Sequence, residues 1–306
     1  MAYRFFPDST VEANIHRLLY EQVEKAINQL SQTFEKNPAE AIHDARKCLK
    51  KSRSVLRLIR KSIDKETYKQ EKNTLRDVGR SLSLARDGAV YQKTLDNLLK
   101  AYEMTLEADA FSDLQTSLSN LYSVRLGKLI EHEEILHNLV NELKKSHTRL
   151  QQLALQETGW SAIAPNLHRI YRQGRERFYT AYDEGSDTAF HEWRKRVKDL
   201  WYDTRLLKRL WPPVMDAFED EAHRLSSLLG DSHDIAELRH FLLHHPEEIE
   251  WPETEQKVLL PLMEHRQYKL HQQAQELGQK LYVEAPEAFI DRVAGYWKTW
   301  FESSKG

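Results

Sequence analysis

Glycine and proline are scarce in this sequence, which has only 10 Gly and 9 Pro among 306 residues. Average usage would be about 7% and 5%. Turns and short strands depend on these residues, so their scarcity argues against folds built from many strands and favours long helices. No apolar run approaches the roughly 18 residues that a membrane-spanning helix needs. We therefore expect no association with a membrane.

Cysteine is nearly absent, because Cys48 is the only one in the chain. One thiol cannot form an intramolecular disulfide or a zinc site with several thiolate ligands. The first residues also lack the basic and then apolar layout of a secretory signal. Both absences favour a soluble protein of a reducing compartment, and we expect a cytoplasmic location.

Net charge is small, with 45 Lys and Arg against 47 Asp and Glu. This balance excludes a uniformly basic protein that coats nucleic acid. The charge is unevenly distributed, however: residues 1–150 have 25 − 21 = +4 and residues 151–306 have 20 − 26 = −6. Residues 42–61 alone hold eight basic residues and one Asp. Near-neutrality therefore coexists with a concentrated basic segment.

Apolar residues recur at helical spacing along most of the chain, and no segment alternates as a strand does. The pattern predicts an all-α fold. We expect helices at about residues 9–34, 39–62, 65–84, 89–106, 111–155 with a break near Gly127, 163–182, 188–210, 214–229 and 235–244, followed by two closing helices.

The two halves of the sequence are related. A shift of 148 residues places Ile42–Lys50 on Phe190–Lys198, with His, Arg, Lys and Lys coinciding at four positions. A shift of 147 places Leu82–Asp87 on Leu229–Asp234. These ordered matches predict a duplicated helical unit, with residues 8–156 and 160–303 forming two pseudo-symmetric antiparallel bundles.

Basic residues of both repeats fall on one helix face, within about 140° of arc on a helical wheel. Like charges at this spacing repel, whereas ordinary exposed helices mix both signs. The acids Glu192, Asp199 and Asp203 lie off the stripe. Such a face is suited to a multivalent anion. The candidate binding residues are His43, Arg46, Lys47, Lys50, Arg53, Arg57, Arg60, His191, Arg194, Lys195, Lys198, Arg205 and Lys208, with Arg17, Arg76, Arg80, Arg86, Arg169, Arg172 and Arg175 as a second tier.

Evidence for catalytic motifs in the sequence is weaker than the evidence for the basic helix faces. His43-Asp44 and His233-Asp234 are similar to the doublet of metal-dependent phosphohydrolases, but the two doublets do not correspond through the repeat. There is no glycine-rich phosphate loop and no nucleophile elbow. We expect a binding protein with no catalytic residues, no metal and no cofactor.

At His43-x-x-Arg46-Lys47-x-x-Lys50 and its copy from His191 to Lys198, the sequence resembles the CHAD family, the conserved histidine α-helical domain. Supporting matches lie at Leu82–Asp87 and Leu228–Asp234. The resemblance implies two helical bundles related by a pseudo-twofold axis, with basic residues of both lining a central groove or pore. It also implies binding of inorganic polyphosphate and association with polyphosphate granules and their proteins.

The resemblance has one departure and leaves alternatives open. Trp201 stands where the family usually has arginine, and Arg205 follows one turn later. No Glu-x-Glu-x-Lys motif of a triphosphate tunnel domain is present, so we expect a stand-alone binding module. An RNA-binding adaptor could use the same surface, although single-strand recognition favours exposed aromatic side chains. A metal-dependent phosphohydrolase is the third hypothesis, and a protein scaffold is the last.

Overall fold

The computed structural model describes residues 3–107, 109–131, 133–249 and 251–303. Regular structure in these ranges is helical, without a strand, which confirms the predicted all-α fold. Among these residues, no helix combines the length and apolar character needed to cross a bilayer.

The helices of the first half begin at clear capping signals. Thr10 accepts a hydrogen bond from the amide of Ala13 at the start of the first helix, and Asn37 does the same for Glu40 at the start of the second. Such caps satisfy amides that have no partner within the helix. The helices are α1 (Val11–Asn28), the π-helical turn η1 (Gln29–Thr33), α2 (Pro38–Leu58), α3 (Lys65–Ser81), α4 (Leu84–Ala101), α5 (Ser112–Glu131) and α6 (Glu133–Gln151).

The second half has fewer and longer helices. Gly185 adopts a left-handed conformation with φ of 65° and ends the first of them, as glycine commonly does at this position. The helices are α7 (Gly159–Glu184), α8 (Asp187–Leu207), α9 (Pro212–His244), α10 (Glu253–Leu281) and α11 (Pro286–Ser303).

Two predicted boundaries differ from the structure. Gly127 lies inside α5, which continues to Glu131 without a break at this glycine. The helices expected at 214–229 and 235–244 are one continuous α9. Gly230 does not interrupt α9, because the helix is packed on both sides of it: Leu225 and Leu229 are buried in one part of the core and Leu238 in another.

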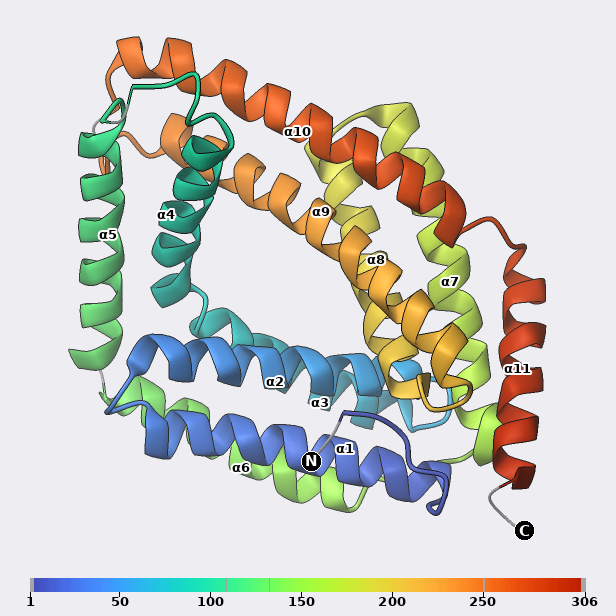
Figure 1. The fold of residues 1–306 in the computed structure, drawn as a ribbon. Coiled ribbons are helices and arrows are strands. Elements are labelled where there is room, and N and C mark those ends of the chain that lie inside the picture. Colours follow the sequence, from blue (N-terminus) through green and yellow to red (C-terminus); the bar gives the residue numbers. More distant parts are fainter. Residues whose placement is uncertain (1–2, 108, 132, 250, 304–306) are drawn as a thin grey trace.

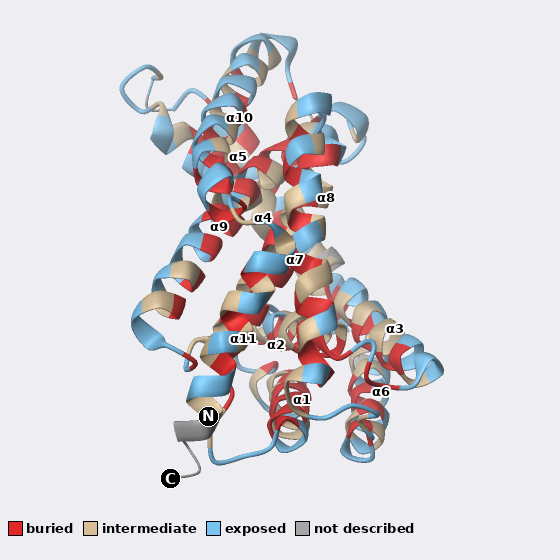
Figure 2. Ribbon diagram, turned by 90° about the vertical axis from the view of Figure 1, so that its right-hand side faces the viewer, coloured by how far each residue is buried: buried red, intermediate tan, exposed pale blue. Residues whose placement is uncertain are grey.

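The helices form a frame, as Figure 1 shows. α1, α2, α3 and α6 make the lower side, α4 and α5 the left side, α9 and α10 the upper side, and α7, α8 and α11 the right side. Figure 2 shows that buried residues concentrate on the helix faces that pack together.

The apolar core has two parts, and neither follows the division of the sequence into halves. The larger joins α1, α2, α3 and α6 to α7, α8, α11, the amino-terminal part of α9 and the carboxyl-terminal part of α10. The smaller joins α4 and α5 to the carboxyl-terminal part of α9 and to α10. Each part of the core therefore contains helices from both sequence repeats, and the duplication itself stays a prediction.

α2 and α8 cross at a buried polar contact. The hydroxyl of Ser54 donates to Oδ1 of Asp203 at 3.1 Å, and both residues are fully buried. One turn away, Nη2 of Arg57 lies 2.5 Å from Oδ1 of Asp199. This crossing fixes the relative position of the two helices that carry the repeated basic motif.

Candidate anion-binding site

A groove of about 290 Å³ lies where α2 and α8 face α9. α2 and α8 both contribute basic side chains, and α9 supplies mainly polar ones. We call it the basic groove. Its basic and histidine residues from the first two helices are His43, Arg46, Lys47, Lys50, Arg194 and Lys198. The remainder of its lining is Trp201, Tyr202, His223, Ser226, Ser227, Gly230, Asp231 and Asp234.

The amphipathic pattern of α2 orients its basic residues. Ala45, Cys48 and Leu49 are buried in the core, so the opposite face must look outward. The guanidinium group of Arg46 donates to the carbonyl of Gly79 and the hydroxyl of Ser83 at the end of α3. Arg46 is therefore held in place at the edge of the groove.

α8 is oriented in the same way. Trp193, Val197 and Leu200 are fully buried, and this anchoring turns Arg194 and Lys198 toward the basic groove. Both are half-buried, as are Arg46 and Lys50 on the facing helix. Basic side chains from both copies of the repeated motif thus line one groove.

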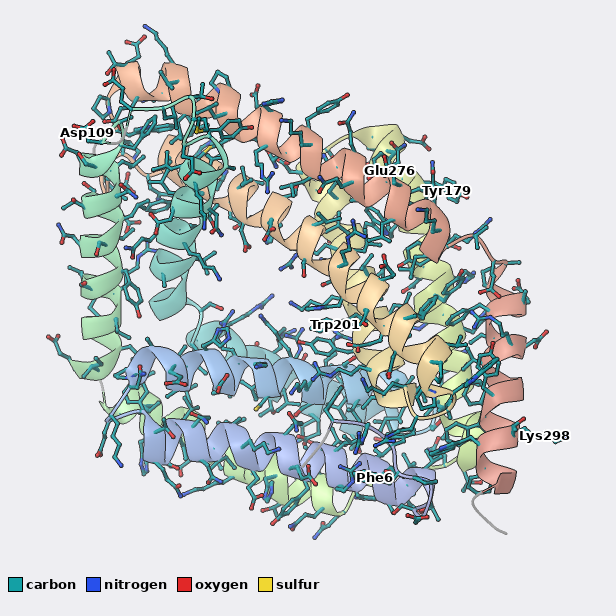
Figure 3. All side chains as sticks on the ribbon, in the orientation of Figure 1. Phe6, Asp109, Tyr179, Trp201, Glu276 and Lys298 are labelled. Carbon is teal, nitrogen blue, oxygen red and sulfur yellow. The ribbon has the colours of Figure 1, made fainter. Side chains whose placement is uncertain are left out.

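Trp201 forms part of the groove wall. Its ring lies between those of Tyr202 and His223, with centroids 4.6 Å and 4.3 Å away and interplanar angles of 26° and 24°. Its indole N–H donates to Oε1 of Glu219 at 2.6 Å. Figure 3 shows Trp201 at the inner edge of the frame, near α2 and α9. The aromatic ring in place of the family's arginine therefore provides a rigid surface.

Two histidines meet beside the groove. Nδ1 of His191 on α8 lies 3.1 Å from Nδ1 of His233 on α9, so one ring must donate and the other accept. Burial, reinforced by Arg194, lowers the pKa of His233 to about 3. Burial and Lys195 lower the pKa of His191. The pair is neutral at pH 7, and it links α8 to α9 without adding charge.

The His233 pKa gives a stability prediction. Between pH 3 and 6.5 the unfolded chain binds a proton at this residue that the native protein does not bind. The contribution of His233 to stability should therefore be most favourable above pH 6.5 and fall as the pH is lowered. From pH 7 to 4.5 the loss through this group is about 2 to 3 kcal/mol. Urea unfolding of the wild type and His233→Gln should differ in pH slope; equal slopes would contradict the prediction.

Arg53 and Arg57 of α2, and Arg60 just after its end, lie outside the lining of the basic groove. Arg57 pairs with the buried carboxylate of Asp199. Burial and the neighbouring Arg57 lower the pKa of Arg53, and the guanidinium of Arg60 lies 5.4 Å from the ring centroid of Tyr68. The crossing of α8 over α2 at Ser54 separates Arg57 and Arg60 from Lys50, which the helical wheel cannot show.

The other predicted residues of α8 are also distributed beyond the groove. Lys195 pairs with Glu192 on the same helix. Lys208 lies 3.0 Å from Oδ1 of Asp216. Together with Arg205 and Lys47, Lys208 lines a different pocket beside α1.

The second-tier arginines have mainly local contacts. Arg17 donates to the carbonyl of Arg4, and Arg175 donates to that of Tyr282. Arg76 pairs with Asp77, and Arg172 lies 3.8 Å from Glu176. Arg169 is near Asn166, and Arg80 is exposed on α3. The side chain of Arg86 lies outside the described residues.

The contribution of α9 to the groove was not predicted from the basic stripes. His223, Ser226 and Ser227 line the groove because α9 packs along α8. Asp231 and Asp234 belong to the second motif of the repeat, Leu228–Asp234. This motif is the one sequence feature that indicated a role for α9 in the site. Both aspartates also line a larger cavity of about 620 Å³, whose other walls come from α2, α4, α5 and α10.

Potential metal ligands do not cluster at the groove within the part of the chain that the structure describes. There, the one group of three whose ligand atoms lie within 4.8 Å of one another is His245, Glu247 and Glu248. These residues follow the end of α9, and the two glutamates are exposed.

Comparisons with known proteins agree with this architecture. Among solved structures, PptA from Streptomyces chartreusis is similar, with a TM-score of 0.54 and 12% sequence identity over 96% of this chain and 100% of that one. At this identity the likeness concerns the fold alone. No curated protein matches the sequence. The model of the CHAD domain family matches residues 17–243, from α1 to α9. The match covers well over half of the chain, and the protein therefore belongs to the CHAD domain family.

Proposed function

We propose that the protein binds inorganic polyphosphate in the basic groove. The observation that carries the proposal is that Arg46 and Lys50 of α2 line the same groove as Arg194 and Lys198 of α8. Membership of the CHAD family supports this choice of ligand. The proposed role is that of a non-catalytic module in the cytoplasm that associates with polyphosphate granules and their proteins.

The chemistry of the groove suits a linear polyanion without bases. Polyphosphate has one negative charge at almost every phosphate, and it offers oxygens alone as acceptors. Arginine presents a planar fork of donors to two such oxygens, and lysine presents a compact charge with three donors. Regularly placed cations on two facing helices are sufficient for recognition.

The stacking of Trp201 with neighbouring rings favours polyphosphate over RNA as the ligand. Proteins that bind single strands stack bases on exposed aromatic faces. Here the rings of Tyr202 and His223 already stack on Trp201. A base would have to compete with these two rings for contact with Trp201. In a competition assay at equal phosphate concentration, polyphosphate should displace single-stranded RNA, and the reverse result would assign the groove to RNA.

The affinity of the basic groove for polyphosphate should depend on the salt concentration. If four cations of the groove neutralise phosphates, the logarithm of affinity should fall linearly with that of salt, by about 3 for each tenfold increase. The measurement is fluorescence anisotropy of labelled long-chain polyphosphate between 50 and 500 mM KCl. Absence of binding at 50 mM KCl, or an affinity independent of salt, would overturn the proposed function.

Catalysis and location need separate tests. Incubation of the protein with polyphosphate and Mg²⁺ or Mn²⁺ should release no orthophosphate above the background without protein. In cells, a fluorescent fusion should coincide with polyphosphate granules and become diffuse when polyphosphate is depleted. Steady release of phosphate would support the hydrolase hypothesis instead, and unchanged foci after depletion would contradict the granule association.

A further inference from the structure

A second pocket, of about 360 Å³, lies on the other side of α2 from α3. It is enclosed by α1 and its π-helical turn, by α2, by the end of α8 and by the chain that precedes α1. We call it the amino-terminal pocket. Its basic residues are Arg4, Lys25, Lys47, Lys51, Arg205 and Lys208.

Negative charge in the amino-terminal pocket is small. Asp44 is the only carboxylate among the described residues that line it, and its Oδ1 lies 3.9 Å from Nζ of Lys47. Six basic residues and one acid thus line the pocket, and one of the six, Lys208, also pairs with Asp216 of α9. Burial, followed by the charge of Arg205, lowers the pKa of Lys51. Mutual repulsion in this pocket would be relieved by a bound anion.

Buried polar atoms in the same pocket are a second, independent observation. Gln22 is 2% exposed, and its Oε1 has no hydrogen-bond partner among the described residues. Nε of Arg4 and Oε1 of Gln29 are likewise buried without a partner in that part of the chain. A buried polar group without a partner is destabilising. A phosphate oxygen would accept a hydrogen bond from Nε of Arg4, whereas the two glutamine oxygens are acceptors and would need a donor such as a water molecule that accompanies the ligand.

Contacts of Tyr3 fix the shape of the amino-terminal pocket. The hydroxyl of Tyr3 donates to the carbonyl of Lys51 at 3.2 Å, and the ammonium group of Lys51 lies 5.3 Å from the centroid of the Tyr3 ring. The Tyr3 ring in turn packs edge-on against Tyr202 of α8. These contacts place the segment before α1 against the helix crossing and close one side of the pocket.

We propose that the amino-terminal pocket binds a compact inorganic phosphate oligomer of about triphosphate size, independently of the basic groove. The excess of cations favours a multiply charged anion, and a volume of about 360 Å³ has room for a short oligomer. Lys47 lines both this pocket and the basic groove. A long polyphosphate can therefore occupy both, a consequence that rests on the proposed function of the groove.

The test uses the full chain, tripolyphosphate as the probe and isothermal titration calorimetry at 50 mM KCl. Lys25→Gln/Arg205→Gln should weaken tripolyphosphate binding at least tenfold. Lys50→Gln/Lys198→Gln, the matched variant of the basic groove, should weaken it by a clearly smaller factor. Each double variant should weaken long-chain binding, and circular dichroism melts should show that both fold like the wild type. Arg205→Lys, which retains the charge, should recover part of the affinity.

Several results would overturn the proposal: no tripolyphosphate binding by the wild type, equal binding by Lys25→Gln/Arg205→Gln, or a loss confined to the groove variant. ATP carries the same phosphate chain on a nucleoside and should bind more weakly, because esterification removes charge from one end. Tighter binding of ATP would assign the pocket to nucleotides and also overturn it. If tripolyphosphate binds as expected but long polyphosphate does not bind more tightly, the function proposed for the groove fails while the pocket stands.

Discussion

The variant Lys50→Glu/Lys198→Glu is expected to bind long-chain polyphosphate at least 100-fold more weakly than the wild type. Both lysines line the basic groove, one from each crossing helix. Loss of a hydrogen bond to a charged group costs about 1.5 to 3 kcal/mol, and two such losses amount to about 100-fold or more. The new carboxylates also repel the ligand. Anisotropy titration at 50 mM KCl measures the effect.

The matched control is Lys144→Glu/Lys269→Glu, which changes the net charge equally. Lys144 on α6 and Lys269 on α10 are exposed and line none of the three pockets described above. This control should bind within about threefold of the wild type, since exposed charges beyond a Debye length are largely screened. Equal losses in both variants would mean that net charge, and not the groove, determines binding.

Arg57→Ala should destabilise the protein by about 3 kcal/mol. Arg57 lies 2.5 Å from the carboxylate of Asp199, whose side chain is only 4% exposed. Close by, burial and the charge of Asp199 raise the pKa of Asp203. Removing one partner of a buried ion pair costs about 3 to 5 kcal/mol, and Arg196, 3.2 Å from Asp199, compensates for part of this. Urea unfolding at pH 7 measures the loss.

The double variant Arg57→Ala/Asp199→Asn distinguishes a structural role from a ligand contact. Because it removes the uncompensated carboxylate, it should recover at least half of the lost stability. The single variant should retain polyphosphate affinity within about fivefold when measured well below its unfolding transition. An unchanged stability combined with a large loss of affinity would show that Arg57 contacts the ligand.

The helices could be predicted from the sequence because their apolar faces repeat regularly. In α2 the apolar positions Ala45, Cys48 and Leu49 are all buried, so the direction of the basic face followed directly. Breaks were less predictable. Gly230 suggested an end of a helix but lies within α9, because the surrounding leucines keep the helix packed on both sides.

The grouping of basic residues could be predicted only in part. A wheel places Arg46, Lys50 and Arg57 on one arc, and repetition of the motif indicates that α8 contributes similar residues. A helical wheel represents one helix and carries no information about the helix that packs against it. α8 crosses at Ser54, and from there Arg57 meets Asp199 while Lys50 remains in the groove. Pairing with Asp199 is a long-range contact, which helical periodicity does not encode.

The position of the crossing sets a width limit for any ligand. Lys50 and Lys198 each lie about one turn from the contact between Ser54 and Asp203, whereas Arg46 and Arg194 lie about two turns from it. Two crossing helices diverge from their vertex, so the space between the cation rows widens in that direction. If the groove binds polyphosphate as proposed, a thin single chain would fit nearer to the vertex than a wide nucleic-acid duplex. Width would then separate polyanions even where their charge densities are alike.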